Sequence, residues 1–186
     1  RRNLTRLLVL VRSSLPRPTL LVTEDEIVTL DREQVASDTV EFVRLISAMD
    51  SSVRRETLRS AVDLYRGPFL DGFALPDAAE FESWMEEERR TWERRVLDTL
   101  AALIEVYSAE RDYTAAIAFA ERYLQHDELA EDIHRRLIAL YAAVGDRTAA
   151  LRQFERCAVA LERELGVSPL PETRAVFEAV REGAID

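Results

Sequence analysis

The residue types that carry most enzyme chemistry are scarce in this sequence. Its 186 residues include two histidines, His126 and His134, and one cysteine, Cys157. These three side chains cannot supply the four nitrogen and sulfur ligands of a tetrahedral zinc site, and a lone cysteine excludes an internal disulfide. The sequence has no lysine to complete a Gly-rich phosphate loop, and no serine or cysteine stands in a nucleophile-elbow context. We therefore expect no catalytic residues and no metal site, and no cofactor is implied.

Arginines near the N-terminus are better placed for a chemical role, because a guanidinium group binds phosphate. Residues 1–17 contain five arginines, and no acidic residue precedes Glu24. The remaining 20 arginines face 35 acidic residues, so the rest of the chain is strongly negative. A basic head on an acidic body predicts a head that contacts phosphate and a body that does not.

An amphipathic helix over residues 1–15 would position these arginines. Its apolar stripe consists of leucines and Val11 at spacings of three and four. The opposite face carries candidate DNA-binding residues, namely Arg2, Arg6, Val9 and Ser13, flanked by Thr5 and Arg12. The arginines could neutralise phosphates or bind guanine edges in the major groove, and Val9 could touch a thymine methyl. The alternative is a solvated amphipathic helix with incidental arginines.

A short β-hairpin is predicted directly behind this helix. Pro16 and Pro18 end the helix. Two β-branched runs, residues 20–23 and 27–30, are joined by three acidic residues and predict the two strands. Arg17 and Thr23, close to this hairpin, could reach the DNA backbone or the minor groove.

A stride of 34 residues relates two segments of the C-terminal half. The matched pairs include Leu103-Ile104 with Leu137-Ile138, Tyr107 with Tyr141, Asp112 with Asp146, Ala115-Ala116 with Ala149-Ala150, and Glu121-Arg122 with Glu155-Arg156. This is the period of the tetratricopeptide helix–turn–helix unit. Such units cannot bury their apolar faces alone, so they stack and leave a groove that usually binds another protein.

Helical periodicity runs from Asp38 almost to the end of the chain. We expect one helix to begin at Ser51 or Ser52, and a last helix after Pro171 to cap the stack. The long helix and the repeat helices between them are predicted at about 79–108, 113–125, 129–144 and 147–165. Because a solenoid needs about three repeats, the flanking helices must complete the packing.

Most repeat positions are expected to have structural roles. The paired alanines are small where helices pack closely, and the paired aspartates suit turns and N-caps. Cys157 is expected to be buried, and His134, although near Glu131 and Asp132, to be a partly exposed surface residue. Trp84 and Trp92 are expected to face the core. A protein-binding groove would use polar residues on the first helix of each pair, such as Glu105, Arg135 and Arg136.

Further motifs flank the repeats in a recognisable order. They are Leu64-Tyr65-Arg66-Gly67-Pro68-Phe69-Leu70, the Trp84 to Arg90 segment, and, after the repeats, Glu164-Leu165-Gly166-Val167-Ser168-Pro169 with Pro171-Glu172-Thr173-Arg174. In this order they resemble the bacterial transcriptional activation domain of SARP-type regulators, over roughly residues 36–182. A generic tetratricopeptide array has no reason to carry the first or the last motif.

The resemblance implies a two-part architecture. Residues 1–31 look like the end of the winged-helix DNA-binding domain that precedes this domain in the family, a recognition helix followed by a wing. The strands and first two helices of that domain would lie before Arg1, so we expect the chain to be the C-terminal part of a longer regulator. The implied partners are promoter DNA with direct-repeat sites, RNA polymerase or other transcription proteins, and a second copy of the regulator in a homodimer.

These observations predict an all-α fold: a tetratricopeptide-like helical-hairpin solenoid, preceded by a short helix and a β-hairpin. The predicted function is DNA-binding transcriptional regulation and not enzyme catalysis. The alternative is a tetratricopeptide-type interaction adaptor with no DNA binding, whose basic helix is only a docking helix. No apolar run approaches a membrane span, and one cysteine fits a reducing compartment, so a cytoplasmic location is expected.

Overall fold

The computed structural model describes residues 2–25, 27–31, 34–47 and 54–184. Contacts between Cα atoms divide the chain into two compact units, Arg1–Arg44 and Leu45–Asp186. The helix α2 (Asp38–Ile46) crosses the boundary between them.

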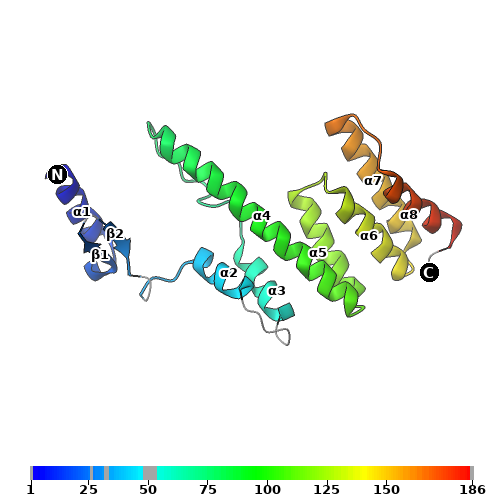
Figure 1. The fold of residues 1–186 in the computed structure, drawn as a ribbon, viewed down its shortest axis with the longest axis horizontal. Helices are drawn as coiled ribbons and strands as arrows, with labels where there is room; N and C mark the ends of the chain where they lie inside the picture. Colours follow the sequence, from blue (N-terminus) through cyan, green and yellow to red (C-terminus); the bar gives the residue numbers. More distant parts are fainter. Residues whose placement is uncertain (1, 26, 32–33, 48–53, 185–186) are drawn as a thin grey trace. The chain divides into compact units, whose positions relative to one another are not determined.

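The first unit holds a helix and a β-hairpin. The helix α1 spans Arg2–Ser14 and ends just before Pro16, and the 3-10 helix η1 spans Pro18–Leu20. Strands β1 (Leu21–Glu24) and β2 (Ile27–Leu30) pair antiparallel, with Leu21 opposite Leu30 and Glu24 opposite Ile27 (Figure 1). Asp25 in the turn has a φ of 52°, which aspartate tolerates better than most residues.

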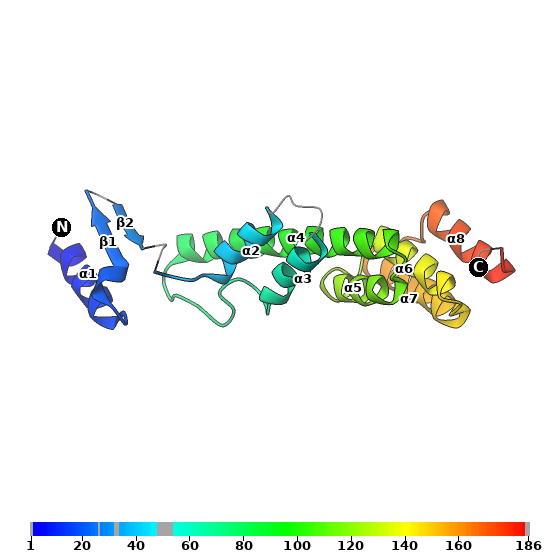
Figure 2. The same ribbon diagram turned by 90° about the horizontal axis from the view of Figure 1, so that it is seen from below.

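The second unit is helical in every described element. In chain order it contains α3 (Arg54–Leu64), α4 (Ala79–Ala109), α5 (Tyr113–His126), α6 (Glu131–Ala143), α7 (Arg147–Leu165) and α8 (Pro171–Glu182). From α4 onwards each helix packs against the next, and α8 also packs against α6 (Figures 1 and 2). The expected start of α3 at Ser51 or Ser52 lies outside the described residues.

Equivalent turns close the two helix pairs, α4 with α5 and α6 with α7. Asp112 and Asp146 are the N-caps of α5 and α7, and each carboxylate accepts a hydrogen bond from the N–H three residues later, at 3.2 and 2.9 Å. The residue before each cap, Arg111 or Gly145, has a left-handed φ, of 61° and 78° respectively. The same backbone conformation therefore recurs at the stride that the sequence predicts.

The core of the second unit lies between these helices. Ala116 and Ala150, which share one repeat position, are both completely buried, as expected for residues at close helix contacts. The largest buried side chains come mainly from α4 and α6, and they include Leu100, Leu103, Ile104, Ile133, Leu137 and Ile138. Rings of Phe154 on α7 and Phe177 on α8 stack with centroids 4.0 Å apart, which joins the last helix to the repeats.

The predicted fold, mostly helical with a two-stranded hairpin near the N-terminus, is confirmed. One boundary differs by two residues: α6 begins at Glu131 and not at about residue 129. The N–H of Leu129 donates to the carboxylate of Asp127 at 3.1 Å, and this turn delays the helix. In the described part of the chain, no helix has both the length and the apolarity required to cross a bilayer.

Candidate functional site

The predicted DNA-binding face of α1 is open to solvent. Arg6 and Val9 lie about one turn apart on this face, and both are exposed, Val9 to 59 %. Thr5 and Ser13 are also exposed, and the Ser13 hydroxyl donates to the carbonyl of Leu10 at 2.7 Å. The side chain of Arg2 lies outside the described residues. The first turn of α1 contains no acidic residue, so the positive end of its helix dipole stays available to an anion.

Arg12 connects α1 to the hairpin. Its Nη2 donates to Thr23 Oγ1 at 2.9 Å and to the carbonyl of Leu21 at 3.4 Å. Two predicted DNA-binding residues are therefore in contact with each other, and together they fix how the helix and strand β1 lie. Arg17, between α1 and η1, is exposed.

Two of the three residues predicted for a protein-binding groove line the same hollow. Arg136 on α6 forms an ion pair with Glu105 on α4, and both line a hollow of about 320 Å³ that also contains Tyr113 and Leu140. Arg135 does not line this hollow, because its guanidinium donates to Thr173 Oγ1 on α8 at 3.4 Å. Both members of the ion pair are well exposed, so the pair adds little stability.

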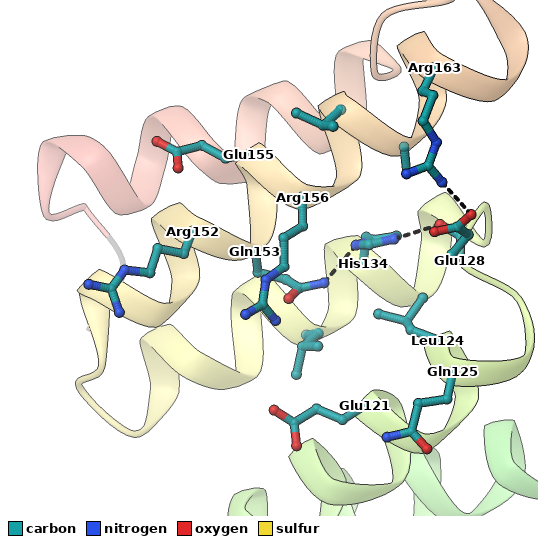
Figure 3. A pocket seen from close by; sticks show the side chains of 13 residues that line it. Glu121, Leu124, Gln125, Glu128, His134, Arg152, Gln153, Glu155, Arg156 and Arg163 are labelled. Carbon is teal, nitrogen blue, oxygen red and sulfur yellow. Dashed lines mark hydrogen bonds and ion pairs between the residues drawn. The ribbon is translucent and has the colours of Figure 1, made fainter.

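A larger hollow, which sequence reasoning missed, lies between the second helices of the two pairs. This α5–α7 groove has a volume of about 900 Å³ (Figure 3). Its lining residues are Glu121, Leu124, Gln125, Glu128, His134, Leu137, Arg152, Gln153, Glu155, Arg156, Val159, Ala160 and Arg163. Its signal in the sequence is the set of arginines at 152, 156 and 163, whose spacing places them on one face of α7. Alone, that pattern is equally typical of a solvated helix face.

His134 is part of the floor of this groove and is buried, so the expectation of a partly exposed residue was wrong. Gln153 Nε2 lies 2.6 Å from its Nδ1, and its Nε2 lies 3.0 Å from the carbonyl of Glu128 (Figure 3). A neutral ring satisfies both partners if Gln153 donates to Nδ1 and Nε2–H donates to the carbonyl. Burial lowers the pKa of His134, which favours this neutral form.

Cys157 is completely buried, as expected. Burial raises the pKa of its thiol to about 11, so at neutral pH it stays protonated and is a poor nucleophile. It therefore packs as a small apolar side chain.

Aromatic rings gather where the loop after α3 meets the start of α4. The ring of Phe69 lies edge-on to Trp84 with centroids 5.8 Å apart and stacks on Trp92 at 6.5 Å. Arg89 holds the loop, because its guanidinium donates to the carbonyls of Phe69 and Leu70 at 2.9 and 3.0 Å. Trp84 remains 44 % exposed, so its expected place in the core was wrong: its ring contacts Phe69 of this loop and Phe81 of α4.

Comparison with protein families identifies what these features share with other proteins. Residues 31–181, which make up most of the chain, match the family model of the bacterial transcriptional activator domain. The chain belongs to this family. The match confirms the resemblance to SARP-type regulators, and the family is defined by transcriptional activation and not by an enzyme activity. Comparison with curated proteins finds no significant match.

The fold of this activator domain recurs in a solved structure. The structure of Mycobacterium tuberculosis EmbR in complex with a low-affinity phosphopeptide is similar, with a TM-score of 0.63 and 24 % sequence identity. The match covers 96 % of this chain but 48 % of the EmbR chain, so the present chain spans about half the length of that protein. The likeness includes the N-terminal helix and hairpin as well as the activator domain.

Proposed function

We propose that this activator-domain chain regulates transcription by binding promoter DNA through α1 and the hairpin. In this proposal residues 1–31 are the end of a winged-helix domain, with α1 as recognition helix and β1–β2 as wing. The exposed face with Arg6 and Val9 carries the proposal, because it joins a cationic group and an apolar group with no acidic residue in the first turn. Arg2 belongs to the same proposed face, and Arg17 and Thr23 to its edge.

Two further observations support this assignment. The apolar stripe of α1 is exposed, with Leu4 and Leu7 at 57 % and Val11 at 45 %, so it offers a surface on which other helices of a winged helix would pack. The contact between Arg12 and Thr23 fixes the hairpin beside the helix, as a wing requires. Arg12 in this proposal positions the wing and does not itself have to contact a base.

The helical residues 36–182 would provide protein contacts rather than DNA contacts. We propose that they set the geometry of a homodimer and contact RNA polymerase or other transcription proteins. The strong negative charge of the chain outside its first residues supports this division, since it would repel a phosphate backbone. The exposed Phe73 and Trp84 beside the loop after α3 offer an apolar contact area of the kind found in protein interfaces.

The test is a salt titration of promoter-DNA binding by the intact protein, read by fluorescence anisotropy. Replacing Arg6→Ala removes one phosphate contact, so the slope of log K against log salt should become shallower by about 0.9. Arg59→Ala, an exposed arginine on α3, is the matched control and should leave the slope unchanged. An unchanged slope for Arg6→Ala would refute α1 as the recognition helix, and no binding of promoter DNA by the intact protein would favour the alternative, an interaction adaptor without DNA binding.

A further inference from the structure

Some charged side chains of the α5–α7 groove have a hydrogen-bond or ion-pair partner, and others do not. Glu121 accepts a hydrogen bond from the hydroxyl of Tyr141 at 2.6 Å, and Glu128 pairs with Arg163 at 2.6 Å. Arg152 and Arg156, in contrast, form no ion pair with any carboxylate among the described residues. Two guanidinium groups are therefore left with unused donors on one wall of a groove (Figure 3).

The preceding repeat shows what the arginine at this position binds. Arg122 is the repeat equivalent of Arg156. Its Nη2 donates to the carbonyl of Val62 at 2.8 Å, and its Nη1 lies 3.4 Å from the carboxylate of Asp63. Both acceptors belong to the last turn of α3, a helix C-terminus with an acidic side chain. Arg156 holds the same position in its own repeat without such a partner.

Arg156 is directed towards the groove and not only towards bulk solvent. The pKa of His134 is lowered mainly by burial, and the charge of Arg156 lowers it further. The pKa of Tyr141 is raised to about 12, chiefly by burial, and Arg156 opposes that rise. Arg156 lines the groove together with His134, a residue of α6.

The groove also has an apolar strip. Leu137 on the floor is almost completely buried, and Leu124 on α5 is half-buried. Val159 on α7 is 62 % exposed although it lies one turn beyond Arg156 on the same face. This exposed branched side chain beside Arg156 gives the wall one apolar contact point next to the two cationic ones, Arg152 and Arg156.

These features exclude several kinds of ligand. Three glutamates and three arginines share the lining, so the groove has no continuous basic surface along which a nucleic-acid backbone could run, whereas single carboxylates can be placed at Arg152 and Arg156. The α7 wall exposes Arg152, Glu155, Arg156 and Arg163 to solvent, so the groove is open and lacks the enclosure of a small-molecule site. A protein segment remains, one that combines large apolar side chains with carboxylates.

We propose that the α5–α7 groove binds an acidic amphipathic helix of another protein. Apolar side chains at successive turns of that helix would contact Leu124 and Val159. Its carboxylates and C-terminal carbonyls would accept hydrogen bonds from Arg152 and Arg156, as the end of α3 does for Arg122. The inference deepens the proposed protein-contact role of the helical domain and is independent of DNA binding.

The experiment is a selection from displayed random peptides of about 15 residues, long enough for an amphipathic helix of this kind. The 186-residue chain is the bait, and enriched peptides are re-measured against R152E/R156E. The matched control is R59E/R174E, which makes the same charge change at exposed arginines outside the groove. Circular dichroism verifies that each variant keeps its helical content.

Enriched peptides should join leucine-like residues at helical spacing with aspartate or glutamate. They should bind R152E/R156E about tenfold or more weakly, and R59E/R174E as tightly as the unchanged chain. Val159→Asp should weaken the same peptides without touching either arginine. Equal binding to both double variants, enrichment of basic peptides, or no enrichment would overturn the proposal.

A groove that instead pairs two copies of this chain would also overturn it. In that case sedimentation would show a dimer that R152E/R156E dissociates, with no peptide competing for the groove. DNA binding is measured separately by the salt titration of Arg6→Ala. Failure of the peptide selection therefore leaves the DNA-binding proposal intact, and the reverse also holds.

Discussion

The turns at Arg111 and Gly145 give a quantitative test of the repeat. Gly145 has a φ of 78°, and a Cβ added there would meet no atom within 4 Å, so in the folded state Gly145→Ala adds backbone strain without a steric clash. A non-glycine residue in this left-handed region costs about 1–2 kcal/mol. The alanine also restricts the unfolded chain, which stabilises the protein by about 0.4–1 kcal/mol. We expect a net destabilisation of about 1 kcal/mol, or a fall in melting temperature of about 3 °C.

Arg111→Gly should act in the opposite direction. Its φ of 61° already carries the strain, and its exposed side chain leaves little packing to lose, so the variant should gain up to about 1 kcal/mol. Urea unfolding followed by circular dichroism measures both changes as shifts of the midpoint at constant slope. The variant with both substitutions, Arg111→Gly and Gly145→Ala, should have a urea midpoint close to that of the unchanged protein.

Gly67→Ala is the matched control for these turns. Gly67 is not among the residues with positive φ, and its added Cβ would lie 3.7 Å from Asp71 Oδ2, an ordinary contact. This variant should be neutral or slightly stabilising, because it only restricts the unfolded chain. If Gly145→Ala behaved like Gly67→Ala, the recurrent left-handed turn would be refuted.

Two other predictions concern the helical core. Because burial lowers the pKa of His134, the unfolded state binds more protons as the pH falls through the ordinary histidine range, so stability should drop between about pH 7.5 and 5.5. Denaturant midpoints should show a weaker drop in His134→Gln. Ala150→Trp or Ala116→Trp should overpack completely buried positions and cost about 1–3 kcal/mol or more, whereas exposed Ala109→Trp should not; equal midpoints for all three would contradict the packing.

Much of the fold followed from local signals in the sequence. Pro16 ended α1 at the expected place, because a proline removes a backbone donor that the helix needs. Asp112 and Asp146 marked the starts of α5 and α7, because a carboxylate before a helical run caps exposed N–H groups. Each of these signals acts within a few residues, so no knowledge of distant contacts was required.

The misjudged positions depend on contacts between distant segments. His134 is buried because Gln153 on the following helix and the Glu128 carbonyl enclose it, and no local pattern predicts that pair. Trp84 stays 44 % exposed although the rings of Phe69 and Phe81 contact it, and no local pattern predicts how much of it these rings cover. The sequence did not predict the α5–α7 groove for the same reason. The arginine pattern on α7 is also typical of a solvated helix face, and only the packing of α5 opposite α7 makes it part of a groove.

The length of α4 has a mechanical consequence. Its 31 residues form one continuous α-helix, about 46 Å long at the usual rise. One end carries the ring cluster around Phe69, and the other packs into the first repeat. If the helix tilts as one body, a rotation of about 5° about its first residue moves its last residue by about 4 Å. A binding partner that contacts this cluster and tilts α4 would therefore also displace the helices that follow α4.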